Sequence, residues 1–111
     1  KNNMSAIAEL QTNVVHLREI YNNQSSEWSQ AYSRYQSLSA RAGASGNSRD
    51  EDRAVDFYNE SVLPLAQDVE SAKLELLNAV HELQVAIRQE AESRLALEAA
   101  INSVADLSRD V

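Results

Sequence analysis

An apolar stripe with the heptad repeat of packed helices runs without a break from Ile7 to Ala42. Its members are separated by alternating steps of three and four residues, and Gln24 is the polar exception among them. They are Ile7, Leu10, Val14, Leu17, Tyr21, Gln24, Trp28, Ala31, Tyr35, Leu38 and Ala42. Side chains at this spacing share one side of an α-helix, so the stripe predicts a long helix with one packed face.

Composition favours the same class of fold for the rest of the chain. The 111 residues include one Pro, two Gly and no Cys, and the apolar residues are mostly Ala, Leu and Val. These residue types favour long helices and provide few strands or turns. We therefore expect one all-α domain over residues 1–111.

The first helix is expected over residues 3–41. Gly43 and Gly46 can adopt the left-handed conformation that ends helices, and small polar residues surround them. A linker is therefore expected over residues 42–48.

The second helix is expected over residues 49–111. Ser48 and Glu51 fit a capping box, in which a hydroxyl and a carboxylate bind the free amides at a helix start. Pro64 lies inside this helix and predicts either a kink near residues 59–63 or a break with a new start at Pro64.

A second heptad stripe follows the linker, and polar residues interrupt it. Its members are Val55, Asn59, Val62, Ala66, Val69, Lys73, Leu76, Val80, Leu83, Ile87, Glu90, Arg94, Leu97, Ile101, Val104, Ser108 and Val111. A flanking row widens the apolar face and consists of Leu65, Ala72, Ala79, Ala86, Ala100 and Leu107. A wide face with small residues is typical of a helical bundle more than of a two-stranded coiled coil.

The two helices are expected to form a long antiparallel, coiled-coil-like hairpin. Closing it at the linker is expected to pair Tyr35 with Val55, Trp28 with Leu63, Tyr21 with Val69 and Leu10 with Leu83. Residues from about Gln89 onward then have no partner within the chain. A homodimer that makes a four-helix bundle, or helices upstream of this sequence, would cover them.

Several functional classes are disfavoured by the residues present. A net charge of -7 with scattered basic residues argues against nucleic acid binding. No apolar run reaches the roughly 18 residues of a membrane-spanning helix, and no signal peptide opens the sequence. His16 and His81 lack the spacing of a helical zinc site, and no phosphate loop or nucleophile motif is present. We expect no enzymatic activity, no metal and no cofactor.

Two basic residues are candidates for binding an anion. Lys73 lies in the second stripe, and the expected hairpin brings it close to Arg18. Two facing cations repel each other unless an anion or a carboxylate lies between them, so a pocket for an anion or a carboxylate is one interpretation. In the other, Lys73 extends out of the interface toward nearby glutamates.

An aromatic patch supplies the remaining candidates. Trp28, Tyr32 and Tyr35 are expected on one side of the first helix, with Arg34 beside them. Aromatic rings with a guanidinium suit a small ligand that carries a carboxylate or an amine. Aromatic residues at heptad spacing also form ordinary cores, and Tyr32, which lies off the main stripe, is the better ligand candidate.

The region from Trp28 to Leu65 resembles the second half of a known sensor domain. The matching residues are Trp28, Tyr32, Asp52, Ala54, Phe57, Tyr58, Val62, Leu63, Pro64, Leu65, Leu76, Leu83 and Gln84. A tryptophan and a tyrosine four residues apart, a turn, an acidic residue before an alanine, an aromatic residue and a Val-x-Pro-Leu run recur in this family. The family that these residues resemble is the four-helix-bundle sensor domain of bacterial methyl-accepting chemotaxis receptors.

This resemblance implies a dimeric, periplasmic or otherwise extracytoplasmic sensor between transmembrane helices. Ligands would bind near the dimer interface, and binding would move one helix slightly along the membrane normal. Family members have about four helices per chain, whereas this sequence predicts two. A coiled-coil scaffold or assembly segment that mediates protein–protein interaction is the alternative function, and an effector or toxin-translocation hairpin is a third possibility. The alternative location is the cytoplasm.

Overall fold

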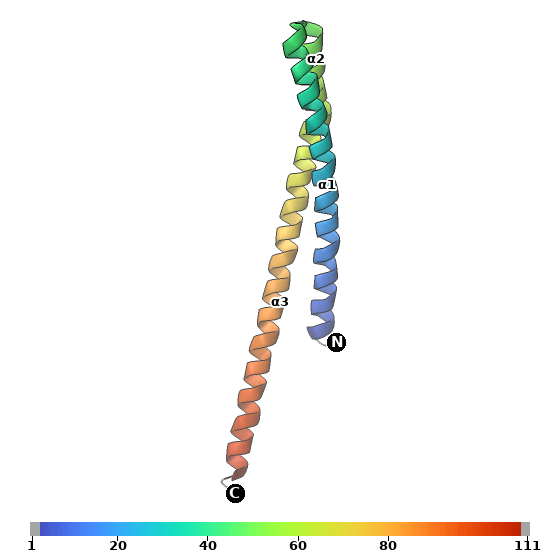
Figure 1. The fold of residues 1–111 in the computed structure, drawn as a ribbon. Coiled ribbons are helices and arrows are strands. Elements are labelled where there is room, and N and C mark those ends of the chain that lie inside the picture. The colour runs from blue at the N-terminus through green and yellow to red at the C-terminus, as the bar shows by residue number, and fades with distance from the viewer. Residues whose placement is uncertain (1–2, 110–111) are drawn as a thin grey trace.

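The computed structural model describes residues 3–109 as two long helical arms that meet at one end (Figure 1). Its elements are α1 (Asn3–Ser45), α2 (Ser48–Phe57), the π-helical turn η1 (Tyr58–Val62) and α3 (Leu63–Arg109). They form a rod of 95 × 21 × 14 Å, and the described residues include no strand. The all-α class and the long helical hairpin expected from the sequence are confirmed.

The connection at the tip is shorter than expected. Helix α1 extends to Ser45, so Gly46 and Asn47 are the non-helical residues of the expected linker 42–48. Gly46 has a φ of 64°, and its N–H donates to the carbonyl oxygen of Ala42 at 3.0 Å. This left-handed residue satisfies a carbonyl at the helix end, which is a common way for a helix to end.

Asn47, not the expected capping box of Ser48 and Glu51, caps the start of α2. Ser48 is itself helical, whereas Asn47 has the extended backbone of an N-cap residue. The Asn47 Oδ1 atom accepts a hydrogen bond from the backbone N–H of Arg49 at 2.9 Å. The second helical arm therefore begins at Ser48, just before the expected start.

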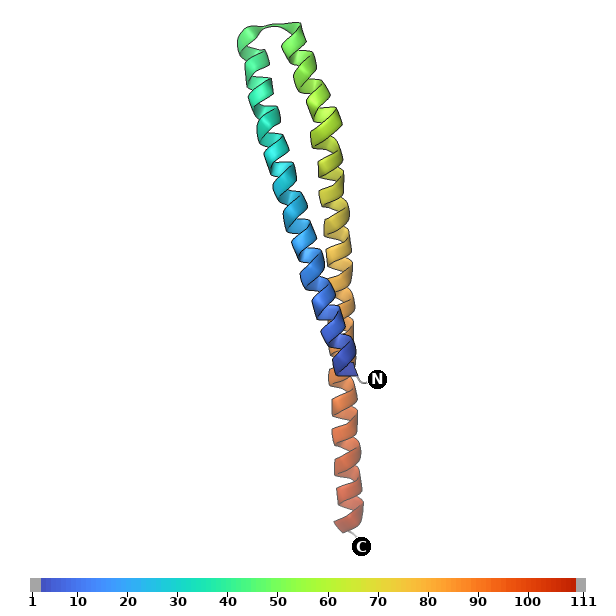
Figure 2. The same ribbon diagram turned by 90° about the vertical axis from the view of Figure 1, so that its right-hand side faces the viewer.

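The irregularity expected near residues 59–63 is the π-helical turn η1. The N–H of Leu63 donates to the carbonyl of Tyr58, five residues earlier, in place of the usual four. Pro64 follows directly; it has no N–H, and in a regular helix its ring would collide with a carbonyl four residues earlier. A widened π-turn can move that carbonyl aside, and the arm continues toward the far end (Figure 2).

The apolar stripe of α1 packs against the second arm along its whole length. Each of its members from Ile7 to Leu38 is half-buried, and Ala42 is 5% exposed. The two arms overlap at the tip in Figure 1 and near the N-terminus in Figure 2, so they wind around each other. This is the geometry that a heptad repeat specifies.

The second arm packs with part of the expected stripe and with the flanking row beside it. Ala72 and Ala79 are buried at 6% and 5% exposure, whereas the stripe members Lys73 and Ile87 are exposed. Small alanines let the two helices approach closely, and turning Lys73 outward avoids desolvating its ammonium group. The expected flanking row therefore forms the interface as far as Ala86, together with stripe members such as Val69, Leu76 and Leu83.

The expected pairing of the arms is corrected in part at the tip. Tyr35 and Val55 line the same pocket, as expected, but Val55 remains 55% exposed and the ring of Tyr35 contacts Tyr58, with centroids 5.1 Å apart. Leu63 is 40% exposed, so it is not the buried partner that was expected for Trp28.

The far part of α3 extends beyond the end of α1. Glu90 is half-buried, whereas every residue from 91 to 109 is exposed. Figure 2 shows this segment as the orange-to-red end of α3 below the N-terminus. We call residues 91–109 the overhang. Its position confirms that the chain offers no partner beyond about Gln89 within the described range; the stripe member Val111 lies outside that range.

Candidate functional site

Four aromatic rings form a ladder between α1 and the π-turn. Trp28 stacks on Tyr32 with centroids 5.3 Å apart and an interplanar angle of 18°. Tyr32 lies 6.0 Å from Tyr35, and Tyr35 lies 5.1 Å from Tyr58 of η1. We call these four residues the aromatic ladder. It couples side chains of α1 directly to the irregular turn of the second arm.

The aromatic ladder is accessible from solvent at one member. Tyr32 is 36% exposed, whereas Trp28, Tyr35 and Tyr58 are half-buried. Exposed aromatic faces can stack on flat ligands or attract cations. The structure thus brings together Trp28 and Tyr32 as expected, and Tyr32 is the more accessible of the two.

Tyr58 was missing from the expected site residues. It is among the residues that carry the sensor-domain resemblance, but the expected pairing places Val55 opposite Tyr35. Ala54 and Tyr58 both face α1 in the structure and are four residues apart. Recognising Ala54 as an interface residue would therefore have identified Tyr58 from the sequence.

Arg34 lies against a different aromatic side chain from those expected. Its guanidinium carbon is 5.4 Å from the ring centroid of Phe57. This cation–π contact holds α1 to the end of α2. Arg34 therefore contributes a contact that joins the two arms.

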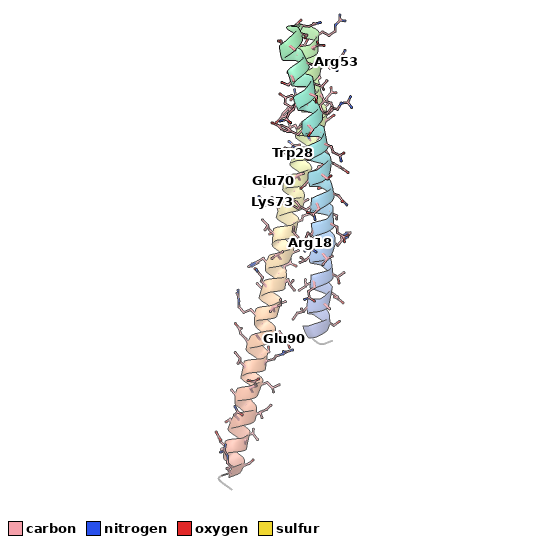
Figure 3. The ribbon with its side chains drawn as sticks, viewed as in Figure 1. Arg18, Trp28, Arg53, Glu70, Lys73 and Glu90 are labelled. Carbon is pink, nitrogen blue, oxygen red and sulfur yellow. The ribbon has the colours of Figure 1, made fainter. Side chains whose placement is uncertain are left out.

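Arg18 and Lys73 are exposed residues on opposite arms (Figure 3). Across residues 3–109, neither forms an ion pair or a hydrogen bond with Glu19, Glu70 or Glu75. Because Ala72 occupies the interface, Lys73 does not face Arg18 from within it. Lys73 therefore extends out of the interface, as in the second interpretation, but within residues 3–109 it forms no ion pair with the nearby glutamates.

A shallow groove lies where α1 ends against α3. It measures about 500 Å³ and is lined by Ile7, Ile87, Glu90, Ala91, Arg94 and Leu95. Arg94 Nε donates to Glu90 Oε1 at 3.3 Å, as two opposite charges four residues apart on a helix can do. Figure 3 shows Glu90 at the level of the N-terminus of α1. The groove therefore lies at the point where α1 ends and the uncovered surface of the overhang begins.

His16 and His81 are both exposed. Among residues 3–109, no group of three or more acidic or histidine side chains is placed to hold a metal ion. None of the described helices has the length and apolar character needed to cross a bilayer.

Comparison with protein-family models, with curated proteins and with solved structures gives no match.

Proposed function

We propose that this chain is a non-enzymatic sensing and relay module, similar to the second half of a chemotaxis-receptor sensor domain. In this proposal it lies outside the cytoplasm, between transmembrane helices, and dimerises into a four-helix bundle. It binds a small molecule and passes a helix displacement to the far end of α3. One observation carries the proposal: the aromatic ladder of α1 rests on η1, the irregular turn that leads into α3.

The contact between Tyr35 and Tyr58 gives this arrangement a mechanism. A ligand that stacks on Tyr32 competes with the packing of the neighbouring rings in the aromatic ladder. The resulting change in ring packing reaches Tyr58 through Tyr35. A π-turn and a regular α-turn differ by one residue in hydrogen bonding, so conversion between them moves the following helix. Because α3 is helical from Leu63 to Arg109, a shift at its start reaches its end. Two packed states with a small energy difference are sufficient for such a relay.

Binding is tested through Trp28, which is the single tryptophan of the chain. We expect its fluorescence to change when a bound compound alters the stack with Tyr32. A panel of amino acids, organic amines and carboxylates is titrated into the wild-type chain and into Tyr32→Ala. Binding at the aromatic ladder requires a response that Tyr32→Ala weakens at least tenfold, and no response from any compound contradicts the proposal.

The relay is tested by distance measurements between labels on introduced cysteines. The chain has no native Cys, so the labels attach only at the chosen positions. Labels at Asn13 and Glu98, both exposed, report motion of α3 against α1. Labels at Arg41 and Arg53 lie on the tip side of η1 and serve as the control. The proposal requires a ligand-dependent change in the first pair only. An unchanged first pair in the presence of a bound compound would leave a binding protein without a relay.

A coiled-coil scaffold is the second candidate function. The overhang favours it, because five large apolar side chains are 58–66% exposed there: Leu95, Leu97, Ile101, Val104 and Leu107. A scaffold of this kind holds its partners at a fixed separation along a rod 95 Å long. It requires association but no response of Trp28 to small molecules, so the same titration separates the two functions.

A further inference from the structure

Gln24 is the polar residue in the interface stripe of α1, and its side chain is incompletely satisfied. The Gln24 Oε1 atom is buried and accepts no hydrogen bond from any described residue. A buried acceptor without a donor is unfavourable, and an apolar side chain would pack in the same place without that cost. This oxygen therefore has an unused capacity to bind a hydrogen-bond donor.

Gln24 lines a small cavity between α1 and α3. The cavity measures about 120 Å³. Its lining consists of Ile20, Gln24, Asp68, Ser71, Ala72 and Glu75. Ile20 and Ala72 provide an apolar wall, and the other four side chains carry oxygen. Three of these, an amide oxygen and two carboxylates, present acceptors, while the hydroxyl of Ser71 can donate or accept.

The charges around this cavity are negative. Asp68 and Glu75 are two helical turns apart on one side of α3, and neither forms an ion pair within residues 3–109. Lys73 points roughly 140–160° away from both of them around the helix axis, by the geometry of 3.6 residues per turn. The cavity thus combines acceptor atoms with an unbalanced negative field, which favours a cation that can donate hydrogen bonds.

We propose that this cavity binds the ammonium group of a small organic amine. An ammonium carries three N–H donors, and Gln24 Oε1 and the carboxylates of Asp68 and Glu75 are the acceptor groups that the cavity lining offers to them. The volume admits a small head group, and Trp28 of the aromatic ladder lies one helical turn from Gln24 on the same stripe. The inference goes beyond the proposed relay, because it concerns binding alone and names the chemical class of the ligand.

Thermal unfolding of the whole chain in methylammonium chloride tests this site, with tetramethylammonium chloride at equal concentration as the matched cation. Both salts supply the same charge and screening, but tetramethylammonium has no N–H donor. We expect methylammonium to raise Tm by a few degrees more than tetramethylammonium, through preferential binding to the folded state. Equal shifts in the two salts overturn the proposal.

Substitutions locate the effect within the molecule. Gln24→Leu removes the acceptor and continues the apolar stripe, so we expect a higher Tm without amine and no difference between the two salts. Asp68→Asn should reduce the difference, whereas Asp56→Asn, at an exposed acid of α2, should leave it unchanged. A difference that survives in Gln24→Leu overturns the site. Failure of the relay measurements with intact methylammonium binding would count against the proposed function alone.

Discussion

At the scale of single residues, the tip depends on one backbone conformation. Gly46 is the described glycine with a positive φ, at 64°, whereas Gly43 is helical. A Cβ built on either residue meets no atom within 4 Å, so space does not distinguish them. Their different roles come entirely from backbone conformation, because L-residues with side chains disfavour the left-handed region.

This difference predicts opposite effects for two matched substitutions. Gly46→Ala should destabilise the chain by about 1–2 kcal/mol, since alanine pays the left-handed penalty. Gly43→Ala should stabilise it by up to about 1 kcal/mol, since alanine is the better helix former. Urea unfolding followed by circular dichroism measures both. A destabilising Gly43→Ala would mean that α1 ends before Ser45, as the sequence had suggested.

Trp28 provides the second test at this scale. Full burial of an indole predicts a loss of about 3–5 kcal/mol on truncation to alanine. Because Trp28 is half-buried and stacks on the exposed Tyr32, we expect Trp28→Ala to cost about 2 kcal/mol.

A double-mutant cycle with Tyr32→Ala isolates the stack between the two rings. It should give a coupling of about 0.5–1.5 kcal/mol. Chemical denaturation of the four proteins supplies the values. A coupling near zero would show that the two rings do not contact each other in solution.

At the scale of elements, the π-turn explains how a proline is accommodated inside a long helical arm. A proline in a regular helix interior costs about 3 kcal/mol, through a lost hydrogen bond and a clash with a carbonyl. In η1 the Leu63 N–H bonds five residues back, to Tyr58, so hydrogen bonding has already changed where Pro64 begins. Part of the proline penalty is therefore already relieved by the local structure.

We accordingly predict a modest gain from Pro64→Ala, about 1 kcal/mol in place of about 3. The residual gain comes from the restored N–H donor and from alanine's helix propensity. Urea unfolding of the variant measures it, and Gln67→Ala, at an exposed position one turn further along α3, controls for propensity alone. A gain of about 3 kcal/mol would show that η1 does not relieve the clash.

The packed face of the first arm was predictable from the sequence, whereas that of the second arm was predictable only in part. Every residue of the first stripe faces the second arm, because its apolar pattern has a single polar member and so a single solution. The second arm offers two adjacent rows, one with Lys73 and one with Ala72. Heptad counting favoured the first row, whereas the cost of burying an ammonium and the fit of alanine favoured the second.

The row of the second arm that packs inward also explains which contacts of the candidate site the sequence did not predict. Trp28 and Tyr32 share a helix, so their stacking follows from a spacing of four residues. Tyr58 comes from the other arm, and its contact with Tyr35 depends on the row that packs inward. Arg34 faces Phe57 for the same reason. Contacts within a helix were accessible from spacing, whereas contacts between arms required the packing.

At the scale of the whole molecule, the overhang continues the hairpin interface without a partner. The interface positions of α3 repeat into the overhang as Ser93, Leu97, Ala100, Val104 and Leu107, which carry no charge. The charged residues of the overhang fall outside this row; they are Glu92, Arg94, Glu98, Asp106 and Arg109. An uncharged apolar row suits a partner helix with the same pattern, and a second copy of the chain supplies one.

Two leucines of similar exposure make this proposal testable. Leu97 is 61% exposed and lies in the uncharged row, whereas Leu95 is 66% exposed and lies outside it. If the wild-type chain is a dimer at micromolar concentration, Leu97→Glu should weaken association at least tenfold, because each copy would bury a carboxylate. Leu95→Glu should leave association nearly unchanged, since its side chain stays in water. Sedimentation equilibrium measures all three proteins. A monomeric wild-type chain would exclude the homodimer, and equal weakening by both variants would place the contact on another side of α3.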